Sequence, residues 1–199
     1  GWVWAGFSQL GEFGRGKSKH RPRNDPALYN GDYPFIQTGV VKASAGRIRT
    51  FDETYNEAGL KQSKLWPSGT VCITIAANIA ASGVLEFDAC FPDSVVGLIC
   101  ENGVLPEYIE FFVRTVREDL DRFAPATAQK NINLATLEKV CIPLPPTAEQ
   151  HEIVSRASQV ATSIQVVEFA LGQEDNRASS LRQSILSAAF SGHLLAYQP

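Results

Sequence analysis

The last quarter of the chain carries a heptad pattern that constrains it to a long helix. Apolar or small side chains recur there at alternating steps of four and three residues, the spacing of the a and d positions in a coiled coil. Glu174 alone interrupts the series, within the polar stretch 172–177. The other seam residues are Ile153, Ala157, Val160, Ile164, Val167, Leu171, Ala178, Leu181, Ile185 and Ala188.

The register of this seam continues across the polar stretch, which favours one helix over two. A single helix over 148–190 would be about 65 Å long at a rise of about 1.5 Å per residue. A hairpin of two helices broken at Gly172 is the alternative. The proline-rich stretch 143–146 stops the preceding strand, and Thr147 and Gln150 have the spacing of a capping box at the start of the helix.

A lone helix of this length cannot bury its seam, so the pattern predicts a partner. The small residues Ala157, Ala178 and Ala188 suit the close approach of a second helix. We expect that helix to come from another chain or from a missing half of the protein. Packing of the seam against the chain's own first part is the alternative.

The first 146 residues have the pattern of a β-rich globular domain. Apolar, β-branched runs over 70–77 and 94–100 predict buried strands, and 33–41 predicts a strand with a polar interruption. Helical spacing appears over 105–123 and in a short stretch, 134–139. The predicted fold class is α+β: a β-rich domain over 1–146, followed over 147–199 by a long α-helix that forms an antiparallel coiled coil with a partner.

Charge is distributed unevenly along the chain. The net charge is −3, but residues 1–64 hold ten Lys and Arg against six acids, whereas the remaining 135 residues hold eight against fifteen. A positive first third makes a nucleic acid a candidate partner despite the acidic total. No apolar run is long enough for a bilayer span, and no signal peptide is visible. Reduced thiols, expected from the apolar surroundings of three of the four cysteines, predict a cytoplasmic protein.

Cysteines and histidines form no recognisable catalytic or metal-binding pattern. The four cysteines lack CxxC and zinc-ligand spacing, and Cys72, Cys100 and Cys141 lie in apolar runs that predict buried, reduced thiols. The three histidines are far apart in the sequence. We therefore predict no metal site and no nucleophilic pair.

The stretch 11–18, GEFGRGKS, satisfies the phosphate-binding P-loop pattern at every position. A P-loop requires a helix that begins at Lys17 and Ser18, whereas Pro22 and Pro26 would fall inside that helix. We therefore interpret these residues as a mobile cationic loop that contacts DNA phosphates, with Gly14 and Gly16 allowing close backbone approach. A simple solvated loop is the alternative.

Five stretches together resemble the specificity subunit of Type I restriction–modification systems. They cover most of the chain in order, and the QKNIN loop, the IPLPP…EQ junction and the LRQSIL…AAFSG ending are specific as a set. The stretches are GWVWAGFSQLGEFGRGKS at the start, YPFIQTGVV at 33–41, TIAANIAASGVL at 74–85, AQKNINLATLEKVCIPLPPTAEQHEIV at 128–154 and SSLRQSILSAAFSGHLL at 179–195.

The resemblance implies a DNA target recognition domain over 1–146 and a conserved helical spacer over 147–199. A full subunit of this family carries two such pairs with antiparallel helices, whereas this chain carries one. We therefore expect either a half subunit or an excised half. Two copies are expected to form a homodimer through the helix and to bind an interrupted palindrome in double-stranded DNA. The resemblance also implies a non-catalytic chain that docks methylation subunits and works with a restriction subunit, and those partners bind S-adenosylmethionine, ATP and magnesium.

Candidate DNA contacts follow from side-chain chemistry together with this resemblance. Basic side chains can contact phosphate or guanine, and planar amides can pair with adenine. For Asn78 and Asn131, capping of local turns is an equal alternative. A coiled-coil scaffold that binds protein and a P-loop enzyme stay as other functions. The predicted contacts are Arg15, Lys17, Lys19, Arg21, Arg23, Gln37, Thr38, Asn78, Gln129, Lys130 and Asn131.

Overall fold

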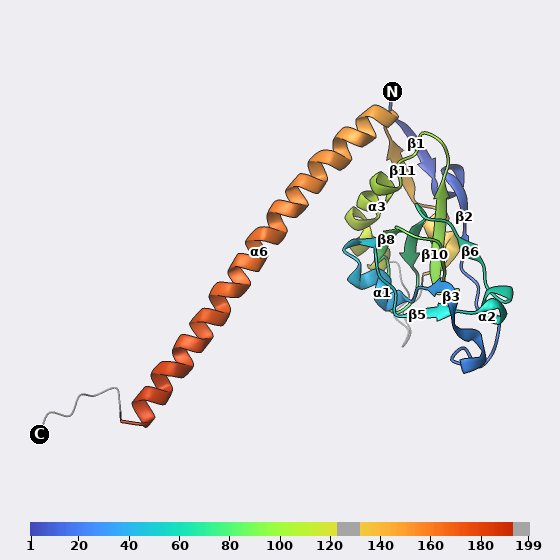
Figure 1. Ribbon diagram of the computed structural model, residues 1–199. Helices are drawn as coiled ribbons and strands as arrows, with labels where there is room; N and C mark the ends of the chain where they lie inside the picture. Colours follow the sequence, from blue (N-terminus) through green and yellow to red (C-terminus); the bar gives the residue numbers. More distant parts are fainter. Residues whose placement is uncertain (123–131, 193–199) are drawn as a thin grey trace, which may run out of the picture. The chain divides into compact units, whose positions relative to one another are not determined.

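The computed structural model describes residues 1–122 and 132–192 (Figure 1). The chain divides into two compact units, 1–154 and 155–199, and each is described by itself. The strands are β1 (Val3–Gly6), β2 (Gly11–Arg15), β3 (Tyr29–Phe35), β4 (Gly46–Ile48), β5 (Glu53–Tyr55), β6 (Leu65–Trp66), β7 (Val71–Thr74), β8 (Ser82–Leu85), β9 (Ala89–Cys90), β10 (Val95–Cys100) and β11 (Cys141–Leu144). The helices are α1 (Thr38–Ala43), α2 (Glu57–Lys61), α3 (Pro106–Thr115), α4 (Arg117–Arg122), α5 (Leu134–Glu138) and α6 (Thr147–Phe190), with 3₁₀ turns η1 (Phe7–Gln9) and η2 (Pro26–Leu28).

The largest sheet of the first unit has the strand order β2-β10-β7-β8-β4. β10 pairs antiparallel with β2 and with β7, and β4 pairs parallel with β8. β7 and β8 are buried along their whole length, as expected of strands with both faces covered. Ile109 and Val113 of α3 share a core cluster with Ile73 and Val96, so α3 packs on this sheet (Figure 1).

Two smaller sheets complete the first unit. One has the order β5-β3-β9-β6 and contains stacked aromatic pairs: Phe35 on Tyr55, with ring centroids 4.1 Å apart, and Trp66 on Phe91 at 5.0 Å. The other is the antiparallel pair β1 and β11. This pair ties the first strand of the chain to the strand that leads into α6. The mixed sheets and the long C-terminal helix confirm the predicted α+β class.

The segment 33–41 is not the single strand that was predicted. β3 ends at Phe35, and α1 begins at Thr38. Gln37 is the extended N-cap residue between them. The polar interruption is therefore the boundary between a strand and a helix. The helix predicted over 105–123 is likewise divided, into α3 and α4.

α6 is one continuous helix of 44 residues, which confirms the single-helix prediction and makes the hairpin alternative wrong. Its first turn does not form the predicted capping box. The Thr147 hydroxyl donates to the Gly103 carbonyl at 3.0 Å, and Gln150 Nε2 donates to the same oxygen at 2.9 Å. Gln150 Oε1 accepts the Leu105 amide at 2.8 Å. These side chains therefore fasten the start of α6 to the turn before α3.

A buried carboxylate joins α3 to the large sheet. Glu110 is 2% exposed, and its Oε1 accepts hydrogen bonds from Arg114 Nε at 2.7 Å and from the Ser82 hydroxyl at 3.0 Å. Arg114 Nη2 also donates to the Ala45 carbonyl at 2.7 Å. Burial raises the pKa of Glu110 above its ordinary value of 4.5, and the hydrogen bond and charge of Arg114 counter this rise only in part.

We expect the unfolding free energy to fall as pH rises through the raised pKa of Glu110. The folded state holds this proton more tightly than the unfolded state, so the contribution is fully present below pH 4.5 and is lost above the folded-state pKa. Glu110→Gln removes the titrating group and therefore this part of the pH dependence. Urea unfolding of the wild type and of Glu110→Gln from pH 4.5 upward measures this difference. Parallel plots of unfolding free energy against pH for the two proteins would contradict the prediction.

None of the helices in the described residues is long and apolar enough to cross a bilayer.

Candidate functional site

Four cationic residues lie on the loop that follows β2, and hydrogen bonds fix its backbone. The Ser63 hydroxyl donates to the Lys17 carbonyl at 2.7 Å, and the His20 amide donates to Gln62 Oε1 at 2.9 Å. Both partners lie just after α2, which Asn56 caps through the amides of residues 58 and 59. The loop predicted to be mobile is thus anchored at two points. Its cations are Lys17, Lys19, Arg21 and Arg23, all exposed.

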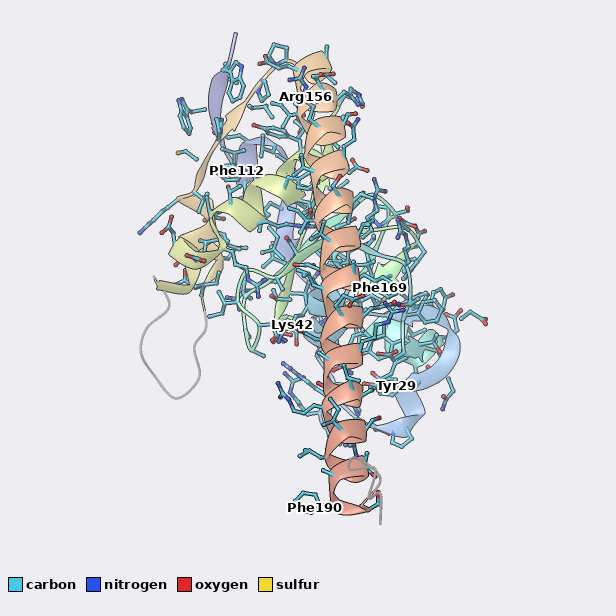
Figure 2. The ribbon with its side chains drawn as sticks, turned by 90° about the vertical axis from the view of Figure 1, so that its left-hand side faces the viewer. Tyr29, Lys42, Phe112, Arg156, Phe169 and Phe190 are labelled. Carbon is cyan, nitrogen blue, oxygen red and sulfur yellow. The ribbon has the colours of Figure 1, made fainter. Side chains whose placement is uncertain are left out.

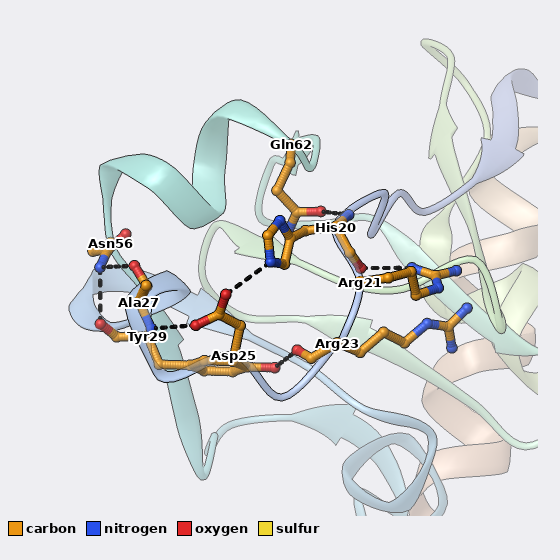
Figure 3. A network of polar contacts seen from close by, with 8 residues as sticks. All are labelled: His20, Arg21, Arg23, Asp25, Ala27, Tyr29, Asn56 and Gln62. Atoms are coloured by element: carbon orange, nitrogen blue, oxygen red, sulfur yellow. Dashed lines mark hydrogen bonds and ion pairs between the residues drawn. The ribbon is translucent and has the colours of Figure 1, made fainter.

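Polar contacts within the loop direct its arginines (Figure 3). His20 Nε2 lies 2.8 Å from Asp25 Oδ2, and Arg21 Nη1 donates to the Ser18 carbonyl at 2.6 Å. The Ala27 amide and then His20 lower the pKa of Asp25, so this carboxylate stays charged. Figure 3 shows Arg21 and Arg23 extending to one side of the loop, away from the His20–Asp25 pair.

The P-loop alternative is wrong. Residues Gly11–Arg15 form strand β2, paired with β10, and no helix begins at Lys17 or Ser18. The amides of this stretch therefore do not form a phosphate-binding turn. Gly16 also has a different role from the one predicted, because an added Cβ would lie 2.2 Å from the Phe91 carbonyl oxygen. Glycine is needed there for packing inside the protein.

Arg15 and Arg23 meet at a cavity of about 380 Å³ on the first unit. Arg15 is the last residue of β2, opposite Val96, and Arg23 comes from the cationic loop. Arg23 Nη2 donates to Asp93 Oδ1 at 2.7 Å. The lining thus combines cationic, carboxylate, hydroxyl and amide groups, the mixture that reads base edges and contacts phosphates. It comprises Arg15, Arg23, Ile75, Ala76, Asp93, Ser94, Ile132 and Asn133.

Three polar lining residues were missed from the sequence: Asp93, Ser94 and Asn133. Asp93 and Ser94 form the turn that leads into β10, where the Val95 amide donates to the Pro92 carbonyl. Asn133 caps α5 by accepting the Thr136 amide at 2.8 Å. The sequence signals only a Pro-Asp turn and a helix cap. Their meeting with Arg23 depends on tertiary packing.

Among the predicted contacts that the structure describes, Gln37, Thr38 and Asn78 do not line this cavity. Gln37 Nε2 donates to Glu53 Oε2 at 2.6 Å, and Thr38 opens α1. Asn78 closes the turn between β7 and β8 through its backbone carbonyl, which accepts the Ala81 amide at 3.2 Å. Gln129, Lys130 and Asn131 lie outside the described residues. The cavity is bounded by Ile132, whose amide donates to the Ile75 carbonyl at 3.0 Å.

The thiols have no role at this site. Cys72 and Cys90 are fully buried, whereas Cys100 is partly buried and Cys141 is exposed, so the burial predicted for Cys141 is wrong. Burial raises the pKa of Cys100 to about 12, which keeps that thiol protonated at neutral pH. Across the described ranges 1–122 and 132–192, no cluster of three potential metal ligands occurs.

The described part of the second unit, 155–192, consists mainly of the rest of α6, and it carries exposed apolar side chains (Figure 2). Along the predicted seam, Val160, Val167 and Leu181 are 57–62% exposed. Phe169 and Val166, which lie off the seam, are also exposed. Ile153 belongs to the first unit and packs on its core. Beyond Ile153, the larger seam side chains are exposed: Val160, Ile164, Val167, Leu171, Leu181 and Ile185.

The sequence profile of the Type I restriction modification DNA specificity domain matches residues 4–172. The EcoKI specificity subunit of Escherichia coli K12 is 33% identical over 109 residues, which are 53% of this chain and 24% of that protein. The EcoBI specificity subunit of Escherichia coli is 41% identical over 69 residues, which are 35% of this chain and 15% of that protein. The chain thus spans a minor part of these relatives.

Solved structures share the fold at low sequence identity. The HsdS subunit from Thermoanaerobacter tengcongensis superposes with a TM-score of 0.71 and 23% identity. A chain from a study of the assembly and conformational transition of the type I R-M system superposes with a TM-score of 0.79 and 22% sequence identity. Each comparison covers 97% of this chain and 46% of the other. This chain therefore corresponds to about half of each solved chain.

Proposed function

The chain belongs to the family of Type I restriction modification DNA specificity domains, and on that premise we propose that it reads one half of a bipartite DNA site. The match over residues 4–172 carries this proposal. The cationic loop and the cavity beside it support it, because cations and base-reading groups lie together on the first unit. Residues 1–146 would act as the target recognition domain and 147–199 as the spacer.

The predicted DNA contacts form two groups in this proposal. Lys17, Lys19 and Arg21 are exposed on the anchored loop and would neutralise phosphates. Arg15 and Arg23 line the cavity and would lie near the bases. Gln37, Thr38 and Asn78, with the three residues outside the described ranges, stay as candidate contacts whose place in the interface is unassigned.

The helix would supply the second half of the site by pairing with another copy. The chain spans 46% of each solved chain, and its helix carries an apolar seam whose larger side chains are exposed. Antiparallel pairing of two copies would place two recognition domains around a two-fold axis. The dimer would therefore read an inverted repeat divided by a fixed spacer.

This recognition role leaves the chemistry to other chains. We expect the dimer to dock methylation subunits and, through them, a restriction subunit. S-adenosylmethionine, ATP and magnesium would be bound by those subunits. The chain itself would contribute sequence discrimination and spacing, and no catalytic group.

Selection from a random duplex library tests the proposal. The full chain, alone and with its methylation subunit, is expected to enrich an inverted repeat whose two halves are separated by a spacer of constant length and variable sequence. Light scattering of the same sample should give a mass near twice 21.7 kDa. Enrichment of an undivided site would contradict the bipartite reading. A dimer that enriches no duplex under either condition would favour the scaffold alternative.

A further inference from the structure

Arg23 is held from two directions at the edge of the cavity. Its guanidinium donates through Nη2 to Asp93 Oδ1 at 2.7 Å, and its carbonyl accepts the Tyr29 hydroxyl at 2.7 Å. The Tyr29 ring packs against Tyr55, with centroids 5.1 Å apart, in the core of the smaller sheet. Backbone and side chain of Arg23 are therefore both oriented, unlike those of an arginine that only adds surface charge.

The acidic partner argues against a phosphate contact at Arg23. Asp93 lowers the positive potential around Arg23, and its own charge repels a phosphate brought to the same place. A guanine edge carries no net charge and offers two acceptors, O6 and N7, that match the arginine fork. An oriented guanidinium beside a carboxylate is therefore better suited to a base than to the DNA backbone.

The rest of the arginine is free to meet a ligand at the cavity. Asp93 engages one nitrogen of a guanidinium that has five N–H donors. The ion pair is about half exposed, with side chains 47% and 45% accessible, so a base edge can reach it. Ser94 and Asn133 line the same cavity and add short polar groups beside the fork.

We propose that Arg23 is a specificity-determining residue that recognises a guanine edge, and that Asp93 is the positioning residue that holds its guanidinium. This inference rests on the proposed DNA-recognition function. It separates Arg23 from Lys17 and Lys19, which form no ion pair within residues 1–122 and 132–192 and would contact phosphate. It also gives Asp93 a role although its charge opposes DNA binding.

Base-preference profiles of Arg23→Ala, Asp93→Asn and Lys19→Ala test the inference. Arg23→Ala is expected to lower the discrimination for guanine at one position of each half-site by about 10- to 100-fold. Asp93→Asn should weaken the same preference while raising affinity for unrelated duplex, because it removes a negative charge and keeps the side-chain shape. Lys19→Ala should weaken binding to all DNA sequences equally.

The outcomes separate this inference from the proposed function. If the wild-type protein selects a bipartite site but Arg23→Ala weakens every sequence equally, Arg23 contacts phosphate and the inference is wrong. If Asp93→Asn lowers the melting temperature and leaves base preference unchanged, Asp93 is only structural. Arg23→Lys keeps the charge without the planar fork, so it should retain affinity but not guanine preference. Absence of any selected site for the wild type overturns both proposals.

Discussion

If two copies pair through α6 as proposed, Val167→Asp is expected to convert that dimer into a monomer at concentrations where the wild type is fully paired. Val167 occupies a seam position, and pairing would bury two unpaired aspartates in each dimer. A buried charge without a partner costs several kcal/mol, so the dimer dissociation constant should rise by at least about 100-fold. Sedimentation equilibrium measures this change directly.

Val166 provides a matched control for this substitution. It is the neighbouring valine on the same helix, 64% exposed compared with 57% for Val167, but it lies off the heptad seam. Val166→Asp should therefore leave the dimer intact. Equal effects of the two substitutions on the dissociation constant would show that the seam is not the pairing face. If neither substitution changes the dissociation constant, the helix does not mediate dimerisation.

Loss of the proposed dimer should also remove the proposed bipartite recognition. Two linked modules bind a double site more tightly than one module does by about 10²- to 10⁴-fold, because the second contact becomes intramolecular. Val167→Asp should thus lower affinity for the complete site by a factor in this range and leave the affinity for an isolated half-site unchanged. Retention of full-site affinity by the monomer would contradict the proposed use of the helix as a spacer.

Local sequence patterns predicted the elements of the fold better than their tertiary contacts. The heptad register predicted that α6 continues across Gly172, and it does. A glycine within a long helix lowers the stability of the helix by only about 1 kcal/mol, a cost that packing of the seam can offset. Gln150 was assigned to a capping box, whereas it bonds the Gly103 carbonyl. The spacing Thr147–Gln150 is local, but Gly103 is distant in sequence. A one-dimensional pattern could not reveal that competing partner.

The same limit applies to the candidate site. The cationic loop was visible from charge and proline content, and the prolines already argued against a P-loop. The pairing of Arg23 with Asp93 was not visible, because 70 residues separate them and only the tertiary fold brings the loop after β2 to the turn before β10. Gln37, by contrast, looked available for a base but bonds Glu53. Residue type indicated chemistry, and packing decided which groups meet.

Lys17→Ala combined with Lys19→Ala is expected to weaken binding to every duplex sequence by about 10- to 100-fold at 0.1 M salt, if each lysine neutralises one phosphate. The dependence of log affinity on log salt should become shallower by about 2, because two fewer counterions are released. Base preference at all positions should stay as in the wild type. Titrations at several salt concentrations measure both effects.

Lys42→Ala combined with Lys61→Ala removes the same charge from other exposed places on the first unit. Because Lys42 is on α1 and Lys61 on α2, outside the anchored loop, this control should change the salt dependence far less. An equal change in both double variants would mean that affinity reflects total charge and not the loop. We expect the smaller change for the control, because Ser63 and Gln62 anchor the loop and hold its cations in one place, where successive phosphates can meet them.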